Sequence, residues 1–151
     1  MYEPESVIPF FRFESLRVYA KALGYFNWLH KTFESHPDLK QSFLTNSFLK
    51  SASKISLNLV EGSTRNKPQF VYYLKLAKSA IRDCVVFTEF AAAAALFNED
   101  DKEYSRNTLI ELIKMIGSLS TSLQKPNPNS TYANDENENG DADIDFDSLI
   151  P

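Results

Sequence analysis

Four long stretches of this sequence repeat apolar residues at spacings of three and four, which is the period of an α-helix with one face in a core. Proline falls at the edges of these stretches, and glycine occurs only four times in 151 residues. Long helices joined by short turns must pack antiparallel to their neighbours in sequence. We therefore predict an all-α, antiparallel up-down-up-down four-helix bundle, with helices near residues 14–34, 38–61, 67–97 and 99–124.

Local start and stop signals support these four segments. A proline-containing turn at residues 35–38 precedes the second helix, and Gly62 is placed for a left-handed cap at its end. Asn66 and Gln69 have the spacing of a capping box for the third helix. Asn98 followed by three acidic residues predicts the start of the fourth, because carboxylates stabilise the positive end of a helix dipole.

The same periodicity predicts the core. The residues expected to be mostly buried are Leu16, Leu23, Leu44, Phe48, Ile55, Leu74, Ile81, Leu112, Ile116 and Leu119. The first helix carries two apolar stripes, one with Leu16, Tyr19, Leu23, Phe26 and Phe33 and one with Val18, Ala22, Tyr25 and Leu29. Two stripes are wider than one core needs, so Val18, Tyr25 and Trp28 are expected to leave apolar surface for a sister subunit.

Charge divides the chain into a body and a tail. Residues 1–125 contain 16 basic and 13 acidic residues, for a net charge of +3, whereas residues 126–151 contain seven acidic and no basic residues. We expect residues 1–125 to form the bundle and residues 126–151 to form a disordered acidic tail, too polar to offset the entropy of ordering. Apolar residues near its end (Ile144, Phe146, Leu149, Ile150) leave two interpretations open, a docking motif or a solvated extension.

Several classes of protein are disfavoured. The sequence has no apolar run of 18 residues, and its first residues carry two prolines and two glutamates, so we expect a cytoplasmic protein without a membrane partner. Cys84 is the only cysteine and is interpreted as a small buried hydrophobe. His30 and His36 lack the spacing of a helical metal site, and the glycines are isolated. We therefore expect no enzyme activity, metal or cofactor.

The stretch from residue 40 to 82 is strongly basic, with eight lysines and arginines against Glu61 alone. Such a patch neutralises phosphates, and Tyr72 and Tyr73 are placed to stack on exposed bases. The alternative is an ordinary solvated helix face, because helices carry many lysines. The predicted nucleic-acid-binding residues are Lys50, Lys54, Arg65, Lys67, Lys75, Lys78 and Arg82.

A polar group at the end of the second helix is interpreted as structural. Asn58 and Glu61 are three residues apart and share a face among positions that should be buried. A buried carboxylate needs a partner, which Arg65 could supply. We expect Asn58, Glu61 and Arg65 to form a network that fixes the register of the helix.

Three segments resemble a known family. They are residues 13–22 (FESLRVYAKA), residues 53–65 (SKISLNLVEGSTR), and Phe70 with residues 73–79 (YLKLAKS). Together they are similar to the bacterial four-helix bundle proteins first recognised as products of intervening sequences in large-subunit ribosomal RNA genes, the S23-like proteins. Leu57 stands where that family usually has serine. After Ser79 the family commonly has glutamates, whereas this chain has Ile81-Arg82-Asp83-Cys84.

The resemblance implies a four-helix bundle, commonly a homopentamer, without established catalytic activity. A related family, the accessory variability determinant of diversity-generating retroelements, is a basic pentamer that binds nucleic acid and a reverse transcriptase. The first interpretation is therefore a non-enzymatic oligomeric scaffold or adaptor. The second is a weak, sequence-tolerant RNA- or DNA-binding accessory protein that uses the basic stretch.

Overall fold

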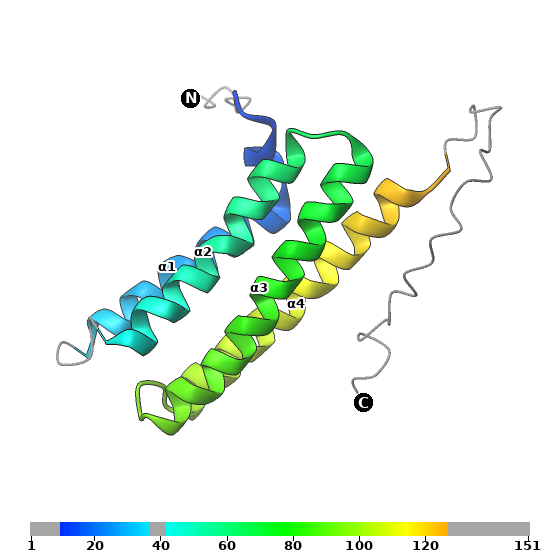
Figure 1. The fold of residues 1–151 in the computed structure, drawn as a ribbon. Helices are drawn as coiled ribbons and strands as arrows, with labels where there is room; N and C mark the ends of the chain where they lie inside the picture. The colour runs from blue at the N-terminus through cyan, green and yellow to red at the C-terminus, as the bar shows by residue number, and fades with distance from the viewer. Residues whose placement is uncertain (1–9, 37–41, 127–151) are drawn as a thin grey trace, which may run out of the picture.

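The computed structural model describes residues 10–36 and 42–126, and within these ranges every regular element is helical. A short 3-10 turn, η1 (Arg12–Ser15), precedes α1 (Arg17–Glu34), α2 (Phe43–Ser63), α3 (Lys67–Ala93) and α4 (Glu99–Gln124). The helices alternate in direction, so that the start of α1, the α2–α3 turn and the end of α4 lie at one end of the bundle (Figure 1). The predicted all-α four-helix bundle is confirmed, whereas the predicted disorder of the tail concerns residues 127–151, outside the described ranges.

The second helix begins five residues later than predicted. Ser42 has an extended backbone, with φ −68° and ψ 157°, and its side-chain oxygen accepts a hydrogen bond from the Thr45 amide at 3.2 Å. This bond satisfies an amide that has no partner within the helix, so Ser42 is the N-cap. The prediction of a start at residue 38 was wrong because it gave the proline and aspartate of the turn more weight than this serine. At its other end, α2 includes Gly62, which does not adopt the predicted left-handed conformation.

The third helix ends at Ala93, four residues before its predicted end. Ala95 adopts φ 59°, the left-handed conformation that glycine favours, and the Leu96 amide donates to the Ala91 carbonyl at 2.9 Å. The Ala95 amide donates to the Ala92 carbonyl at 3.2 Å, which completes a Schellman motif. The run of alanines concealed this end, because nothing in their side chains marks a cap.

The fourth helix has the bounds that the sequence predicts. The Asn98 side chain accepts from the Asp101 amide at 2.8 Å, and Asp101 accepts from the Asn98 amide at 3.1 Å. At the start of α3, the Asn66 side chain accepts a hydrogen bond from the Gln69 backbone amide at 3.0 Å. This is the bond that the N-cap residue makes in the predicted capping box. Side-chain caps at both helix starts therefore fix these boundaries locally.

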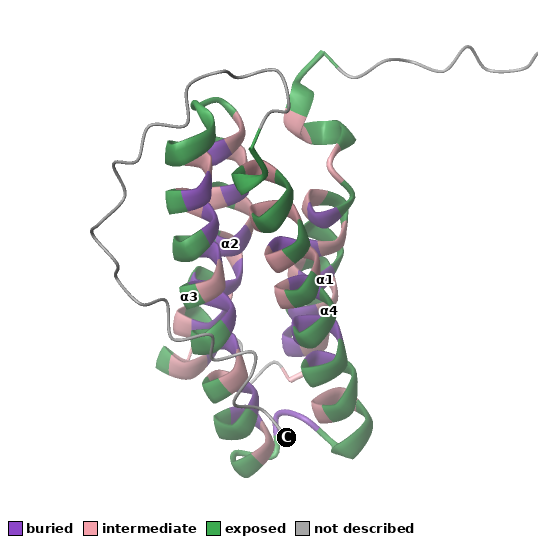
Figure 2. Cartoon of the chain, turned by 90° about the vertical axis from the view of Figure 1, so that its right-hand side faces the viewer, coloured by how far each residue is buried: buried purple, intermediate pink, exposed green. Residues whose placement is uncertain are grey.

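The core confirms most of the predicted buried positions (Figure 2). Leu16, Leu44 and Leu119 are partly buried against the core, and Leu23, 42% exposed, was predicted wrongly. The fully buried members of the predicted set are Phe48, Ile55, Leu74, Ile81, Leu112 and Ile116. On α1, the stripe with Val18, Ala22, Tyr25 and Leu29 fills the core of a single bundle.

A chain of buried hydroxyl groups crosses this core. Thr88 donates to the Cys84 carbonyl at 2.7 Å, so its oxygen accepts from Ser105 at 2.8 Å, and Ser105 in turn accepts from the Tyr25 hydroxyl at 2.8 Å. The chain links α1, α4 and α3. Burial raises the pKa of the Tyr25 hydroxyl, with a smaller contribution from Cys84. Tyr25 therefore stays protonated and serves as the donor at the head of the chain.

Candidate functional site

Three of the predicted nucleic-acid-binding residues share one face of α3. Lys75, Lys78 and Arg82 follow the helical spacing of three and four, and Lys75 and Arg82 are exposed. Glu89 continues this face seven residues later and pairs with Arg106 of α4, with Nη1 and Oε1 3.1 Å apart. The face with Lys75, Lys78 and Arg82 therefore lies on the flank of α3 that borders α4.

The other predicted basic residues lie elsewhere. Lys50 and Lys54 are exposed on α2, which packs against the opposite flank of α3, where Phe70 and Tyr73 approach Gly62. Arg65 and Lys67 are exposed in the α2–α3 turn and at the start of α3. Lys40 lies outside the described ranges. The structure thus divides the basic stretch among one flank of α3, the surface of α2 and one end of the bundle.

The polar group at the end of α2 is at the surface, so its predicted burial was wrong. Arg65 donates to one Glu61 carboxylate oxygen through Nε at 3.1 Å and Nη2 at 2.5 Å, and both side chains are exposed. This hydrogen bond raises the pKa of Arg65. Asn58 donates to the Lys54 carbonyl at 2.8 Å. The Arg65 guanidinium also lies 5.7 Å from the Tyr73 ring centroid, so it ties the turn to α3.

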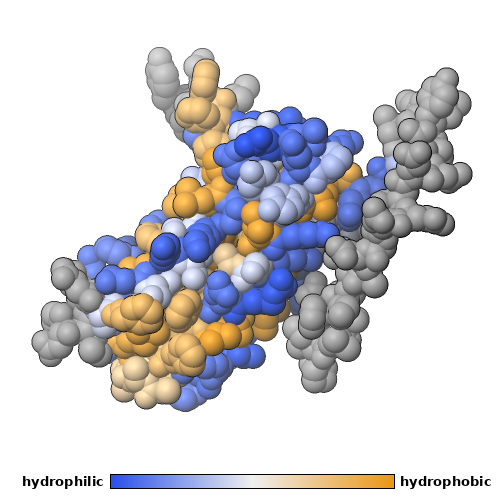
Figure 3. All heavy atoms as spheres, in the orientation of Figure 1, coloured by the Kyte–Doolittle hydropathy of each residue, from blue (hydrophilic) through white to orange (hydrophobic). Residues whose placement is uncertain are grey.

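Exposed apolar residues occur on all four helices, and four of them lie on α3. We call Tyr72, Leu76, Val86 and Phe90 the α3 face, because they follow one outward stripe of that helix. Val86 is 50% exposed and Phe90 is 53% exposed. Phe43, at the start of α2, adds exposed apolar surface. Figure 3 shows hydrophobic atoms gathered where α3 ends and α2 begins.

The residues of α1 that were expected to leave apolar surface for a sister subunit are largely covered within the single chain. Val18 and Tyr25 are buried within the single chain, and Trp28 is half-buried against the rings of Phe97 and Tyr104. The two apolar stripes of α1 are therefore no evidence for an interface with another subunit, because packing within the chain covers most of them. The α3 face was missed because Ser79 and Asp83 interrupt the apolar stripe in its middle.

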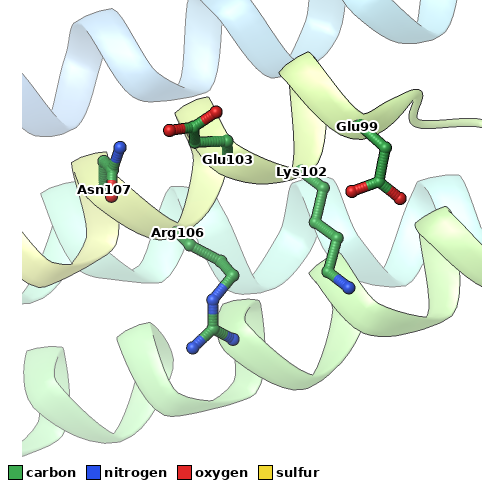
Figure 4. Close-up of a pocket in the computed structure, with 5 residues that line it drawn as sticks. All are labelled: Glu99, Lys102, Glu103, Arg106 and Asn107. Carbon is green, nitrogen blue, oxygen red and sulfur yellow. The ribbon is translucent and has the colours of Figure 1, made fainter.

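A shallow hollow of about 290 Å³ is lined by five α4 residues, Glu99, Lys102, Glu103, Arg106 and Asn107 (Figure 4). Lys102 and Arg106 point toward α3, where the Glu89 carboxylate pairs with both. The Lys102 Nζ lies 3.3 Å from Glu89 Oε2. The basic groups of the hollow are therefore bound by a carboxylate from the neighbouring helix. The salt bridges to Glu89 join this part of α4 to α3.

The groups that reactive sites use are dispersed in the described residues. Within residues 10–36 and 42–126, histidine, cysteine and carboxylate side chains form no group of three that could hold a metal ion. His30 is exposed, with Nδ1 3.7 Å from a Glu34 carboxylate oxygen. Cys84 is buried as predicted, and burial raises the pKa of its thiol. No described helix has an 18-residue stretch apolar enough to span a bilayer.

Comparison with known proteins identifies the family. The family model described as 23S rRNA-intervening sequence protein matches residues 14–118, which is more than two thirds of the chain. The chain belongs to this family. The predicted resemblance is thereby confirmed, and the matched region ends within α4.

A solved structure supports the fold of this family member. It is a protein of unknown function from the S23 ribosomal protein family of Bacteroides thetaiotaomicron, which is 17% identical and superposes with a TM-score of 0.64. The match covers 69% of this chain and 95% of that chain. At this identity the likeness shows the bundle fold alone. No curated protein sequence matches the chain.

Proposed function

We propose that this protein is a non-enzymatic cytoplasmic adaptor that works as a homo-oligomer, with subunits joined through the α3 face. The observation that carries the proposal is the exposure of Tyr72, Leu76, Val86 and Phe90 along one outward stripe. Eighteen helical residues separate the first from the last, so the face is about 27 Å long at 1.5 Å per residue. Leaving such a row of apolar side chains in water costs free energy that a sister subunit removes.

A second copy is the partner that the chain itself supplies. In a ring of identical subunits, the α3 face of each copy packs against a different surface of the next copy. Tyr72 and Phe90 are aromatic, and aromatic residues are enriched in protein interfaces. The family resemblance implies a homopentamer, and we adopt five subunits as part of the proposal.

We expect the double substitution Val86→Asp and Phe90→Asp to dissociate the oligomer. Two carboxylates buried in an apolar part of the interface must be desolvated without partners, which costs several kcal/mol for each ion. Both residues are about half-exposed in the single chain, so the fold tolerates the change. Light scattering coupled to size-exclusion chromatography measures the mass of each variant at micromolar concentration.

The matched control is Leu23→Asp, which changes an exposed apolar residue on α1 outside the α3 face. The Leu23 variant should retain the mass of the wild-type oligomer, and circular dichroism should show the same helicity in all variants. A wild-type protein that is a monomer at micromolar concentration would contradict the proposal.

A second candidate function is sequence-tolerant binding of RNA or DNA, in keeping with a family whose name refers to ribosomal RNA. It is favoured by Lys75, Lys78 and Arg82, which share the α4-facing flank of α3. Exposed Tyr72, with its ring centroid 5.4 Å from that of Tyr73, is a platform for base stacking. In this function the protein would assist a nucleic-acid enzyme, as the accessory variability determinant binds a reverse transcriptase.

We expect a labelled single-stranded oligonucleotide to bind in fluorescence anisotropy, with affinity that falls steeply as salt rises. Changing Lys75, Lys78 and Arg82 to alanine should reduce the slope of log affinity against log salt by about 2, at about 0.7 for each phosphate that is no longer neutralised. Lys31→Ala, a change on α1 away from this flank, should leave the slope unchanged. Equal slopes for the two variants, or no binding at low salt, would contradict this function.

A further inference from the structure

The bundle is electrostatically polarised along its length. We define its basic half as residues 10–22, 53–79 and 112–126, which surround the end formed by the start of α1, the α2–α3 turn and the end of α4 (Figure 1). This half contains ten basic and two acidic residues, a net charge of +8. The other described residues contain five basic and eight acidic residues, a net charge of −3.

Residues 127–151 have the complementary charge. They contain seven acidic and no basic residues, for a net charge of −7. They follow α4 directly after Lys125 and Pro126, so they leave the bundle from the basic half rather than from the opposite end (Figure 1). The polypeptide therefore carries a polyanionic segment covalently attached beside its own concentration of positive charge.

We infer that the basic half of the bundle is the docking surface for residues 127–151, centred on Lys75 and Lys78. These two lysines lie on the flank of α3 that borders α4, the helix from which the acidic segment continues. Lys114 adds an exposed cation on α4 itself. The inference is independent of the proposed oligomer, because it concerns charges outside the α3 face.

The length of the connection suits this docking. Lys75 and Lys78 lie eight and eleven residues after the start of α3, or about 12 and 17 Å along the helix at 1.5 Å per residue. Asp135, the first acid of the segment, follows Lys125 by ten residues. A chain of ten residues without secondary structure has a root-mean-square span of about 17 Å. The acids therefore reach a high effective concentration at these lysines.

A docked segment covers cations that a phosphate backbone would otherwise contact. Seven carboxylates balance most of the charge of +8, and they act at any protein concentration because they are covalently attached. The segment is thus an intramolecular competitor for polyanions at this surface. It would be displaced by a ligand of higher charge density or by high salt.

Cross-linking of the full-length chain tests this inference. The variant Ser148→Cys introduces a thiol beside the last acid, and native Cys84 is buried and shielded from thiol reagents. A thiol-to-amine cross-linker followed by peptide mass spectrometry then reports which lysines lie near the segment. We expect linkage to Lys75 and Lys78 at low salt, and at least about fivefold less linkage at 1 M salt, where the Debye length is about 3 Å.

The controls separate ionic docking from simple tethering. Replacing the seven acids of the segment by their amides should reduce linkage to Lys75 and Lys78 as much as high salt does. Lys31 and Lys50, in the other half of the bundle, are the reference lysines for linkage yield. Even linkage across all four lysines, or yields unchanged by salt and by the amide variant, would overturn the inference.

Discussion

Replacing Gly62 with alanine is expected to lower the free energy of unfolding by about 2 to 3 kcal/mol, at the upper end of the cost of overpacking. A Cβ at this position would lie 2.7 Å from Phe70 Cδ2 and 2.8 Å from Tyr73 Cβ. The Phe70 ring can rotate, but the Tyr73 Cβ is fixed to the backbone of α3. The added methyl group therefore forces α2 and α3 apart near their turn.

Gly24→Ala is the matched control, because Gly24 is also helical and a Cβ there has no neighbour within 4 Å. Alanine at this site should raise the free energy of unfolding by about 0.5 to 1 kcal/mol, since it removes the entropic cost of a glycine within a helix. Urea titration followed by circular dichroism measures both variants. Gly62→Ala with a stability equal to that of Gly24→Ala would show that α2 and α3 are not in close contact.

We expect Ser105→Ala to lower the free energy of unfolding by about 2 kcal/mol and Tyr25→Phe by about 1 kcal/mol. The difference follows from the direction of the buried hydroxyl chain. Removing the Ser105 hydroxyl leaves the Tyr25 O–H without its acceptor and Thr88 without its donor. Removing the Tyr25 hydroxyl leaves the Ser105 bond to Thr88 intact.

The double variant tests whether these hydroxyls act as one unit. Tyr25→Phe in a Ser105→Ala background removes the orphaned donor. The loss of unfolding free energy in the double variant should therefore be smaller than the sum of the losses in the two single variants. The same urea titrations provide all four stabilities of the cycle. Additive losses, or a larger loss for Tyr25→Phe than for Ser105→Ala, would contradict the direction of the chain.

The sequence alone was sufficient for features that depend on neighbours within a few residues. The bounds of α4 follow from the reciprocal bonds of Asn98 and Asp101. The four helices follow from the period of their apolar residues, since burial of one face is the main source of their stability. The family followed from three short segments, of which only Phe13 lies outside the residues that the family model matches.

The tertiary structure decided which face of each helix packs against another helix and which face lies in solvent. Gly62 was predicted to be a left-handed cap, whereas its position against Phe70 and Tyr73 makes it a point of close approach between helices. Leu23 lies on an apolar stripe, yet packing turns a different stripe of α1 into the core. Glu61 lies among apolar neighbours in sequence, and the rotation of α2 places it in solvent.

The candidate sites divide in the same way. The sequence determined that the body is basic and that residues 126–151 are acidic, because charge is a property of composition. It did not determine which flank of α3 its basic residues occupy, or which of its apolar residues stay exposed. Those placements depend on the rotation of each helix about its axis. This rotation is set by contacts between residues far apart in the chain.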